Sequence, residues 1–245
     1  MDQKRIIDEF KELVSIEVHS RDERLIADVL KEKLTALGLT VTEDKAGEVL
    51  GGNTGNLYAQ LPGSTDGEPV LFSAHMDRVG NHGHIVPLVK EEEGKIVSDG
   101  TSILAGDDIG GVAAILAMLR EVKEKQIPHG PIEVAFSVCE ETGVEGSRQY
   151  DFSKFRSKSA FVYDASGKAG TIVLAAPSKG RVTIHVHGVT AHAGNEPEKG
   201  LNALKVAADL IMQLPDGRLS PVSTANFSII EAGSATNVVC DLVTI

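Results

Sequence analysis

Residues 69–77 read Pro-Val-Leu-Phe-Ser-Ala-His-Met-Asp, a short apolar run that ends in a histidine and an aspartate. Apolar runs of this length are typical of buried β-strands. Three further apolar runs lead to acidic residues, at Asp107-Asp108, at Glu140-Glu141 and at Asp164. In open α/β sheets, functional groups collect beyond the carboxyl ends of the strands. The pattern therefore predicts an α/β fold whose acidic and imidazole side chains meet at one edge of the sheet.

Helical and strand patterns alternate along the first two thirds of the chain. Apolar positions recur at helical spacing near the N-terminus and again over 22–37, where Gly38 follows as a typical helix stop. The other elements expected here are a helix at 112–122 and strands at 39–42, 56–61, 70–74, 132–138 and 160–163. This order predicts a three-layer α/β/α sandwich with a mostly parallel sheet.

The pattern changes after Pro177 to a β-α-β-β order. A strand is expected at 181–187, a helix at 200–214 and further strands at 225–231 and 237–245. This is part of a ferredoxin-like α+β module, which would need one more helix and strand. We expect a larger domain over 1–177 and a smaller one over 178–245. Because the sequence stops within a strand pattern, we expect a C-terminally truncated chain in which both domains are incomplete.

Composition excludes several classes of partner. The net charge of −11 argues against nucleic acid, which is bound mainly through Lys and Arg. No apolar run is long enough to cross a membrane, and the opening residues contain acids rather than a signal-peptide core. Two cysteines, Cys139 and Cys240, are too few for a disulfide framework or a cysteine zinc site. We expect a cytoplasmic protein that binds neither nucleic acid nor membrane.

Two of the motifs contain residues that could bind a metal ion. His75 and Asp77 form an His-x-Asp pair, in which the carboxylate can accept the second ring N–H of a metal-bound imidazole. This pair is weak evidence alone, since any buried histidine needs an acceptor. Asp107-Asp108 lies beside glycines just before a helix, where a carboxylate can bridge two metals. The alternative is that one of the two aspartates caps the helix.

Glu140-Glu141 is the most informative pair of residues. Adjacent carboxylates at a strand end repel each other unless a positive charge neutralises them. A metal would do so, and would leave one glutamate as a ligand and the other as a general base. The alternative is an ordinary solvated loop pair. Together the motifs indicate a hydrolase that uses Zn²⁺, Mn²⁺ or Co²⁺.

These residues resemble the motifs of the M20 metallopeptidase family, in its peptidase T-like branch, and the resemblance covers nearly the whole chain. Four segments resemble the family's metal-site motifs: His75-Met76-Asp77-x-Val, Gly106-Asp107-Asp108-x-x-Gly111, Glu140-Glu141-x-Gly143 and Tyr163-Asp164. Three segments resemble its lid-domain motifs: Thr190-Ala191-His192-Ala193-Gly194, Pro197-Glu198-x-Gly200-x-Asn202-Ala203 and Ala235-Thr236-Asn237-Val238-Val239. The resemblance implies a zinc-peptidase-like catalytic domain followed by a lid and dimerisation domain.

The resemblance also implies a role for each site residue. His75 and Asp164 would bind one metal, Asp107 would bridge to a second, and Glu141 would bind that second metal. Glu140 would be the general base and Asp77 would orient His75, while His192 and Asn237 would bind substrate. The peptide after Asp107 would be cis. The cofactors would be two divalent ions, zinc in the first instance, with manganese or cobalt as alternatives.

The implied activity is hydrolysis of short peptides, as by tripeptide aminopeptidases, through a metal-bridging hydroxide, in a homodimer formed by the lid domain. The alternatives are hydrolysis of N-acyl amino acids or other small amides, or an inactive metal-binding or dimerising fragment. The third reading arises because the family's last histidine ligand would lie beyond Ile245. We therefore expect this chain to bind at most one divalent ion tightly and to have little activity, unless His82 or His84 supplies the missing ligand. At position 78 this chain has Arg, where the peptidase T-like branch more often has a small polar residue. The difference leaves the metal ligands intact, but the substrate contacts near this position are not implied by the resemblance.

Overall fold

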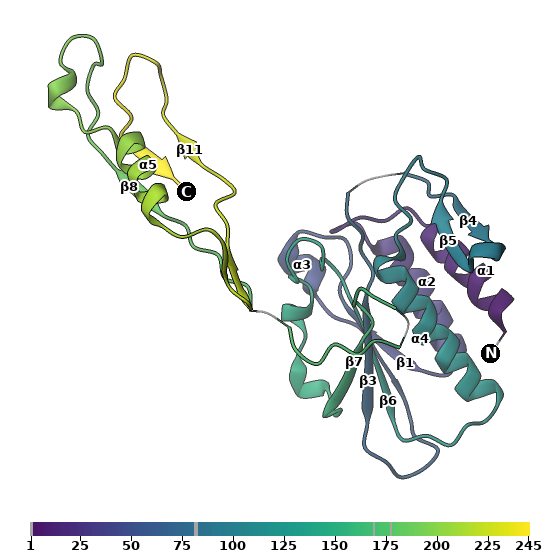
Figure 1. The fold of residues 1–245 in the computed structure, drawn as a ribbon. Coiled ribbons are helices and arrows are strands. Elements are labelled where there is room, and N and C mark those ends of the chain that lie inside the picture. The colour runs from purple at the N-terminus through teal and green to yellow at the C-terminus, as the bar shows by residue number, and fades with distance from the viewer. Residues whose placement is uncertain (1, 81–82, 169, 177) are drawn as a thin grey trace. The chain divides into compact units, whose positions relative to one another are not determined.

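The structure is a computed structural model that describes residues 2–80, 83–168, 170–176 and 178–245 (Figure 1). Contacts between residues divide the chain into two compact units, Met1–Lys168 and Ala169–Ile245. This division lies before the domain boundary expected after residue 177, a residue outside the described ranges. The domain limits read from the sequence stay a prediction.

A five-stranded sheet forms the centre of the first unit. Its strands are β1 (Thr40–Glu43), β2 (Leu57–Leu61), β3 (Val70–His75), β6 (Ile132–Ser137) and β7 (Ser159–Val162), in the spatial order β1-β2-β6-β3-β7. β3 pairs in parallel with β6 and β7, whereas β2 pairs antiparallel with both β6 and β1. The α/β fold is confirmed, with a mixed sheet. The parallel pairing expected for most of the sheet is found for β3, β6 and β7. β2 is antiparallel to them because the connection from β2 to β3, residues 62–69, is too short for the helical crossover that parallel strands need.

Three helices cover one face of this sheet (Figure 1). They are α1 (Gln3–Val14), α2 (Arg24–Ala36) and α4 (Gly106–Glu124). α1 contacts α4, α4 contacts β3, and α2 contacts β1 and β2. Alternate residues of β6, namely Ile132, Val134 and Phe136, are buried in the same apolar core as these helices. None of the described helices is both long and apolar enough to span a membrane.

The opposite face of the sheet carries a loop segment at β2 and β6. Glu133 of β6 accepts hydrogen bonds from the backbone N–H groups of Arg156 and Ser157 and from the Tyr58 hydroxyl. This segment contains the 3-10 helices η2 (Ser147–Gln149) and η3 (Phe152–Lys154). Two helical layers were expected around the sheet. Within the described residues, one face carries the helices α1, α2 and α4, and the other carries this loop segment with its short 3-10 helices.

Some short elements of the first unit were not predicted. They are α3 (Ala46–Leu50) and a hairpin of β4 (Pro87–Lys90) and β5 (Lys95–Ser98), joined by η1 (Glu91–Glu93). Each is five residues or shorter, so its sequence cannot show a helical or strand period clearly. α4 is assigned from Gly106, but Asp107 and Asp108 have non-helical backbone angles, so the regular helix begins only after them, a few residues before the expected 112.

The second unit contains a three-stranded antiparallel sheet and one helix. The sheet has the order β11 (Glu231–Ala232), β12 (Leu242–Thr244), β8 (His185–His187). α5 (Ala203–Gln213) buries two of its alanines, Ala203 and Ala207, against Val243. A further hairpin, β9 (Gly217–Ser220) with β10 (Ser223–Ala225), and η4 (Pro197–Lys199) complete the unit. The expected order is present only in part: β8, α5 and β12 lie within their predicted ranges, but the hairpin of β9 and β10 was not predicted. The strand expected at 225–231 is found only at its two ends, in β10 and β11.

The helical layer provides a direct test of the core. Leu30 of α2 is fully buried, whereas Leu25 of the same helix is 61% exposed. Leu30→Ala should lower the free energy of unfolding by about 2–5 kcal/mol, because it removes buried methyl groups and leaves a cavity. Leu25→Ala, the matched control, should change it by less than about 0.5 kcal/mol. Denaturant titrations of both variants measure the difference, and equal losses would contradict this packing.

Candidate metal centre

The residues expected at the site come together at one edge of the first sheet. His75 ends β3, Glu140 and Glu141 follow β6, and Asp164 follows β7. The possible ligand atoms of His75, Asp107 and Glu141 all lie within 4.8 Å of one another, and so do those of His75, Glu140 and Asp164. β3, β6 and β7 are parallel neighbours, so their carboxyl ends lie side by side. We call these five residues the acidic cluster.

The two ring nitrogens of His75 point to different groups: Nε2 to the carboxylates of the acidic cluster, and Nδ1 to Asp77. The side chain is 2% exposed. Its Nδ1 lies 3.0 Å from the carbonyl oxygen of Asp77 and 3.2 Å from Asp77 Oδ1. Its Nε2 lies 2.9 Å from Asp107 Oδ1. A carboxylate at one ring nitrogen leaves the other free to bind a metal, the arrangement found in many metal sites.

Asp77 is fully buried and links several segments. Its two carboxylate oxygens accept hydrogen bonds from the backbone N–H of Glu140 at 2.9 Å, from that of Glu141 at 3.1 Å, and from the Ser20 hydroxyl at 2.6 Å. These bonds and the contact with His75 hold the pKa of Asp77 below its usual value, although burial alone would raise it. Without exposed surface, Asp77 can orient its neighbours but cannot touch a substrate.

Asp107 and Asp108 point in different directions from the start of α4. The peptide bond between them is cis, as the resemblance implied. Asp107 is 70% exposed and belongs to the acidic cluster. Asp108 is buried, and its Oδ2 accepts the backbone N–H of His75 at 3.1 Å. The pair therefore ties the first turn of α4 to the end of β3.

Gly111 allows α4 to approach the end of β7 closely. A Cβ atom at this position would lie 2.7 Å from the Cβ of Tyr163 and 2.9 Å from its carbonyl oxygen, and would also collide with Asp108 Oδ1. Real Cβ contacts are not this short, so only glycine fits without movement of the helix. Tyr163 directly precedes Asp164, so this approach brings Asp107 and Asp164 into the same cluster.

Two residues at the site, His75 and Asp108, have strongly shifted pKa values. Burial alone lowers the pKa of His75, but the hydrogen bond and charge of Asp77, together with the charge of Asp108, raise it to about 10. Burial raises the pKa of Asp108 to about 8, against the opposing effect of His75. In the metal-free protein, a proton on His75 therefore partly compensates the surrounding carboxylates.

The donor set fits a divalent cation. Burial raises the pKa of Glu140, Glu141 and Asp164, and the charges of neighbouring carboxylates add to this effect while His75 opposes it. A divalent ion among four carboxylates and one imidazole would remove their repulsion. Oxygen and imidazole nitrogen ligands suit zinc, manganese and cobalt. The residues thus fit a metal by their chemistry as well as by their distances.

His192 and Asn237 belong to the second unit, where their two motifs lie side by side. The backbone of Ala193 donates to Asn237 O at 2.9 Å, and His192 forms an isolated β-bridge with Val238. Both His192 and Asn237 are exposed. The Nδ1 of His192 accepts the N–H groups of Gly194 at 3.1 Å and Asn195 at 3.2 Å. In a neutral ring the proton is then on Nε2, which can donate to a ligand.

The remaining candidates are outside the acidic cluster. His84 is exposed and belongs to neither group of possible metal ligands, while His82 is outside the described residues. Arg78 is 3% exposed, and its guanidinium donates to the carbonyl oxygens of Val14 and Gly83. Arg78 therefore connects the end of α1 to the 83–85 loop, a structural role that the sequence did not reveal.

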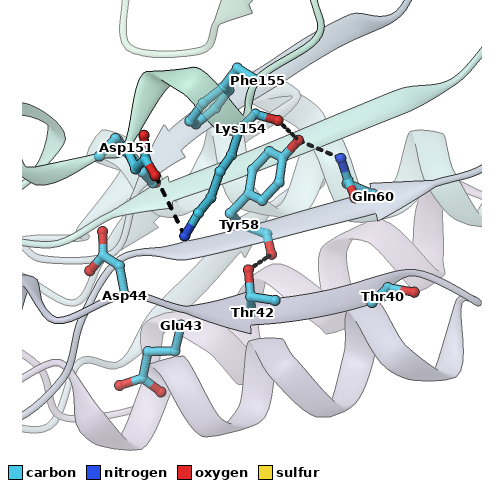
Figure 2. Close-up of a pocket in the computed structure, with 10 residues that line it drawn as sticks. Thr40, Thr42, Glu43, Asp44, Tyr58, Gln60, Asp151, Lys154 and Phe155 are labelled. Carbon is cyan, nitrogen blue, oxygen red and sulfur yellow. Dashed lines mark hydrogen bonds and ion pairs between the residues drawn. The ribbon is translucent and has the colours of Figure 1, made fainter.

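A separate hollow of about 380 Å³ lies over β1 and β2 beside η3 (Figure 2). Its lining includes no member of the acidic cluster. The Tyr58 hydroxyl is engaged with Glu133, Gln60 and the Lys154 carbonyl, and the Lys154 ammonium lies 3.8 Å from Asp151. The main polar groups that line this hollow are thus already bonded within the protein, and we assign no function to the hollow.

Two residues behind the cluster were missed by the sequence analysis. Ser20 and Glu23 lie between α1 and α2, in a stretch that looks like an ordinary polar helix start. Glu23 is nevertheless fully buried. One signal was available: Glu23 precedes the buried residues Ile26 and Leu30 by three and seven positions, so it extends the apolar face of α2.

Comparisons with known proteins agree with this geometry. The sequence profile of peptidase family M28 matches residues 56–194, and that of the M20-type peptidase dimerisation domain matches residues 177–245. Among curated proteins, the uncharacterized protein YqjE of Bacillus subtilis (strain 168) is 39% identical over 241 residues, covering 98% of this chain and 64% of the relative.

Two solved structures resemble the whole chain. Aminopeptidase PepT from Bacillus cereus ATCC 10987 is 42% identical with a TM-score of 0.89. A tripeptidase from Staphylococcus aureus subsp. aureus Mu50 is 34% identical with a TM-score of 0.86. Each comparison covers 100% of this chain and 65% of the other. The chain thus spans just under two thirds of the length of these relatives.

The shifted pKa values predict how pH affects the metal-free protein. The pKa of His75 is raised to about 10, so its stabilising contribution is complete below about pH 6.5 and is lost as pH rises toward 10. The raised pKa of Asp108, about 8, acts in the same direction at lower pH. The thermal midpoint without metal should therefore fall by at least about 3 °C between pH 6.5 and 9.

Calorimetric melting curves with chelator present measure this fall. His75→Gln should lessen it, because the titrating imidazole is removed. His84→Gln, a change at an exposed histidine outside the cluster, should preserve the full fall. A midpoint that is constant or rises across this range would contradict the electrostatic description.

Proposed function

Because the chain belongs to the M20 peptidase family, in its peptidase T-like branch, we propose that it hydrolyses peptide bonds in short peptides with the help of divalent metal ions. The observation that carries this proposal is the convergence of His75, Asp107, Glu140, Glu141 and Asp164 at the ends of three neighbouring parallel strands. Its similarity to an aminopeptidase and a tripeptidase supports short peptides as substrates.

We assign the metal ligands as follows. His75 and Asp164 would hold one ion, Asp107 would hold both, and Glu141 would hold the second, with zinc as the first choice. The position of Asp107 supports its bridging role, since it is the most exposed carboxylate of the α4 start and lies 2.9 Å from His75 Nε2. When bound, a divalent ion polarises a carbonyl oxygen and makes water more acidic.

Glu140 would act as the general base. Burial raises its pKa, which brings a carboxylate closer to the value that suits proton transfer near neutral pH. It would take a proton from the attacking water and deliver it to the nitrogen of the departing amine. Asp77 would hold Glu140 and Glu141 through their backbone N–H groups and would fix the ring of His75.

His192 and Asn237 would bind the substrate. Support comes from the second unit alone, where the two exposed residues lie on paired segments. The backbone bonds to Nδ1 of His192 leave its Nε2–H as a donor for a carboxylate or a carbonyl oxygen of a peptide. Removal of this donor should weaken substrate binding without loss of metal.

Two variants separate the base from the ligand. Glu140→Gln should reduce tripeptide hydrolysis by about 10²-fold or more, yet bind Zn²⁺ with unchanged affinity, because only the proton acceptor is lost. Glu141→Gln should weaken zinc binding as well, because a charged ligand becomes neutral. Hydrolysis of a panel of tripeptides and N-acyl amino acids, with added Zn²⁺, Mn²⁺ or Co²⁺, gives the first readout and zinc calorimetry the second.

Both measurements should be made on this chain and on a form extended to the length of its relatives. Glu145→Gln is a control in the same turn, at an acid outside the cluster that contacts Arg21 and Thr142. Loss of zinc affinity in Glu140→Gln equal to that in Glu141→Gln would make Glu140 a ligand instead of the base. Cleavage of N-acyl amino acids but not tripeptides would refute the proposed substrate class.

We also propose a homodimer formed through the second unit. The match to a peptidase dimerisation domain supports it, as do exposed apolar side chains on α5, where Leu204, Val206 and Met212 are 44%, 45% and 84% exposed. Light scattering at high protein concentration should give twice the chain mass. A double change to Ser of Leu204 and Met212, which are eight positions apart and so lie on one side of α5, should shift the mass toward one chain if this side is the contact. A monomer in the unmodified protein would refute the dimer.

A further inference from the structure

We propose that Glu23 and Ser20 are positioning residues of the metal centre, which hold the backbone of residues 139–141 so that Glu140 and Glu141 point into the acidic cluster. The inference rests on the proposed function, since it concerns residues that would bind metal and move the proton. It adds a second buried carboxylate, from the connection between α1 and α2, to the support that Asp77 provides.

The contacts of Glu23 end on the turn that follows β6. Its Oε1 accepts the backbone N–H of Cys139 at 3.0 Å, and the Cys139 thiol lies 3.6 Å from the same oxygen. Cys139 directly precedes the two glutamates and has a φ of 51°, in the left-handed region that non-glycine residues rarely adopt. A buried acceptor at its N–H therefore stabilises an otherwise unfavourable backbone conformation.

Side chains hold four successive backbone N–H groups of this turn. Asn56 Oδ1 accepts that of Val138 at 3.0 Å, Glu23 accepts that of Cys139, and Asp77 accepts those of Glu140 and Glu141. Successive N–H groups that point to one side make a concave site for anions. Here the carboxylates of Glu23 and Asp77 accept the N–H groups of residues 139–141, so they hold the backbone of the turn in one orientation.

Ser20 strengthens the second of these carboxylates. Its hydroxyl donates to Asp77 Oδ2 at 2.6 Å, the oxygen that also accepts the N–H of Glu141. Ser20 and Glu23 are three residues apart in one short connection. A single segment between α1 and α2 thus supplies one of the two carboxylates that support the turn, that of Glu23, and donates a hydrogen bond to the other, that of Asp77.

Glu23 is a poor choice for stability alone. It is fully buried, and within the described residues its Oε2 is buried without a hydrogen-bond partner. A buried, incompletely bonded carboxylate costs free energy, and an apolar side chain of similar size would avoid that cost. The position of Glu23 behind the metal centre is consistent with a role in directing the turn rather than in filling the core.

Glu9 offers a matched control. It is also a buried glutamate of the first unit, 6% exposed, and its Oε2 also lacks a partner among the described residues. It bonds instead to Arg120 at 2.6 Å and to Lys33 at 3.5 Å, on the helical layer. Glu9→Leu should therefore reproduce any general effect of replacing a buried acid without disturbing the turn.

The test combines amide hydrogen exchange of the metal-free protein with zinc calorimetry. Glu23→Leu should speed exchange at Cys139, Glu140 and Glu141 by at least about tenfold and weaken zinc binding by about 10- to 100-fold, as loss of groups that support metal ligands generally does. Glu23→Gln should retain most of the zinc affinity, because its amide oxygen can still accept the N–H of Cys139. Glu9→Leu should leave both readouts unchanged.

Ser20→Ala is a milder second variant that tests the proposal even if Glu23→Leu fails to fold. It should speed exchange at Glu140 and Glu141 and weaken zinc binding, each by about threefold. Unchanged exchange at residues 139–141 in the Glu23 and Ser20 variants, or an equal change in Glu9→Leu, would overturn the inference. Absence of Zn²⁺, Mn²⁺ and Co²⁺ binding by both this chain and the extended form would refute the proposed function, while the exchange data would still decide the role of Glu23.

Discussion

The metal centre depends on the hydrogen bonds that the buried carboxylate of Asp77 accepts from three separate parts of the chain. Two oxygen atoms without contact to solvent bring together the end of β3, the turn after β6 and the connection between α1 and α2. Such a charge is unfavourable in a protein interior unless every lone pair finds a donor. Four donors meet that requirement here, counting the ring of His75. The centre and the local fold are therefore specified by the same bonds.

Much of this arrangement could be predicted from the sequence, because strand ends in an α/β sheet follow a simple rule. Apolar runs gave the positions of β3, β6 and β7, and the polar residues after them marked the cluster. The rule works for His75, Glu140 and Asp164 because parallel strands end at the same edge. The comparisons add the family, while the assignment of each ligand stays a prediction.

Other features could not be predicted because they depend on contacts between distant segments. Glu23 and Cys139 are bonded to each other although they are far apart in sequence, and neither residue type indicates such a partner. Asp108 could have been a helix cap, and only the fold shows that it accepts the N–H of His75. The antiparallel β2 is a different case: the strands expected at 56–61 and 70–74 leave only residues 62–69 between them, so this reversal could have been read from the sequence. Periodicity describes faces and ends of elements, not their partners.

The close approach at Gly111 has a consequence for how this protein can vary. α4 and the end of β7 touch through a position that has no space for even one methyl group. Asp107 and Asp164 reach the same cluster only at that separation. Position 111 thus limits mutational tolerance at the centre as strictly as the ligands do, although it has no functional group. In a library of variants selected for metal binding, an alanine here should be depleted alongside substitutions of the charged residues themselves.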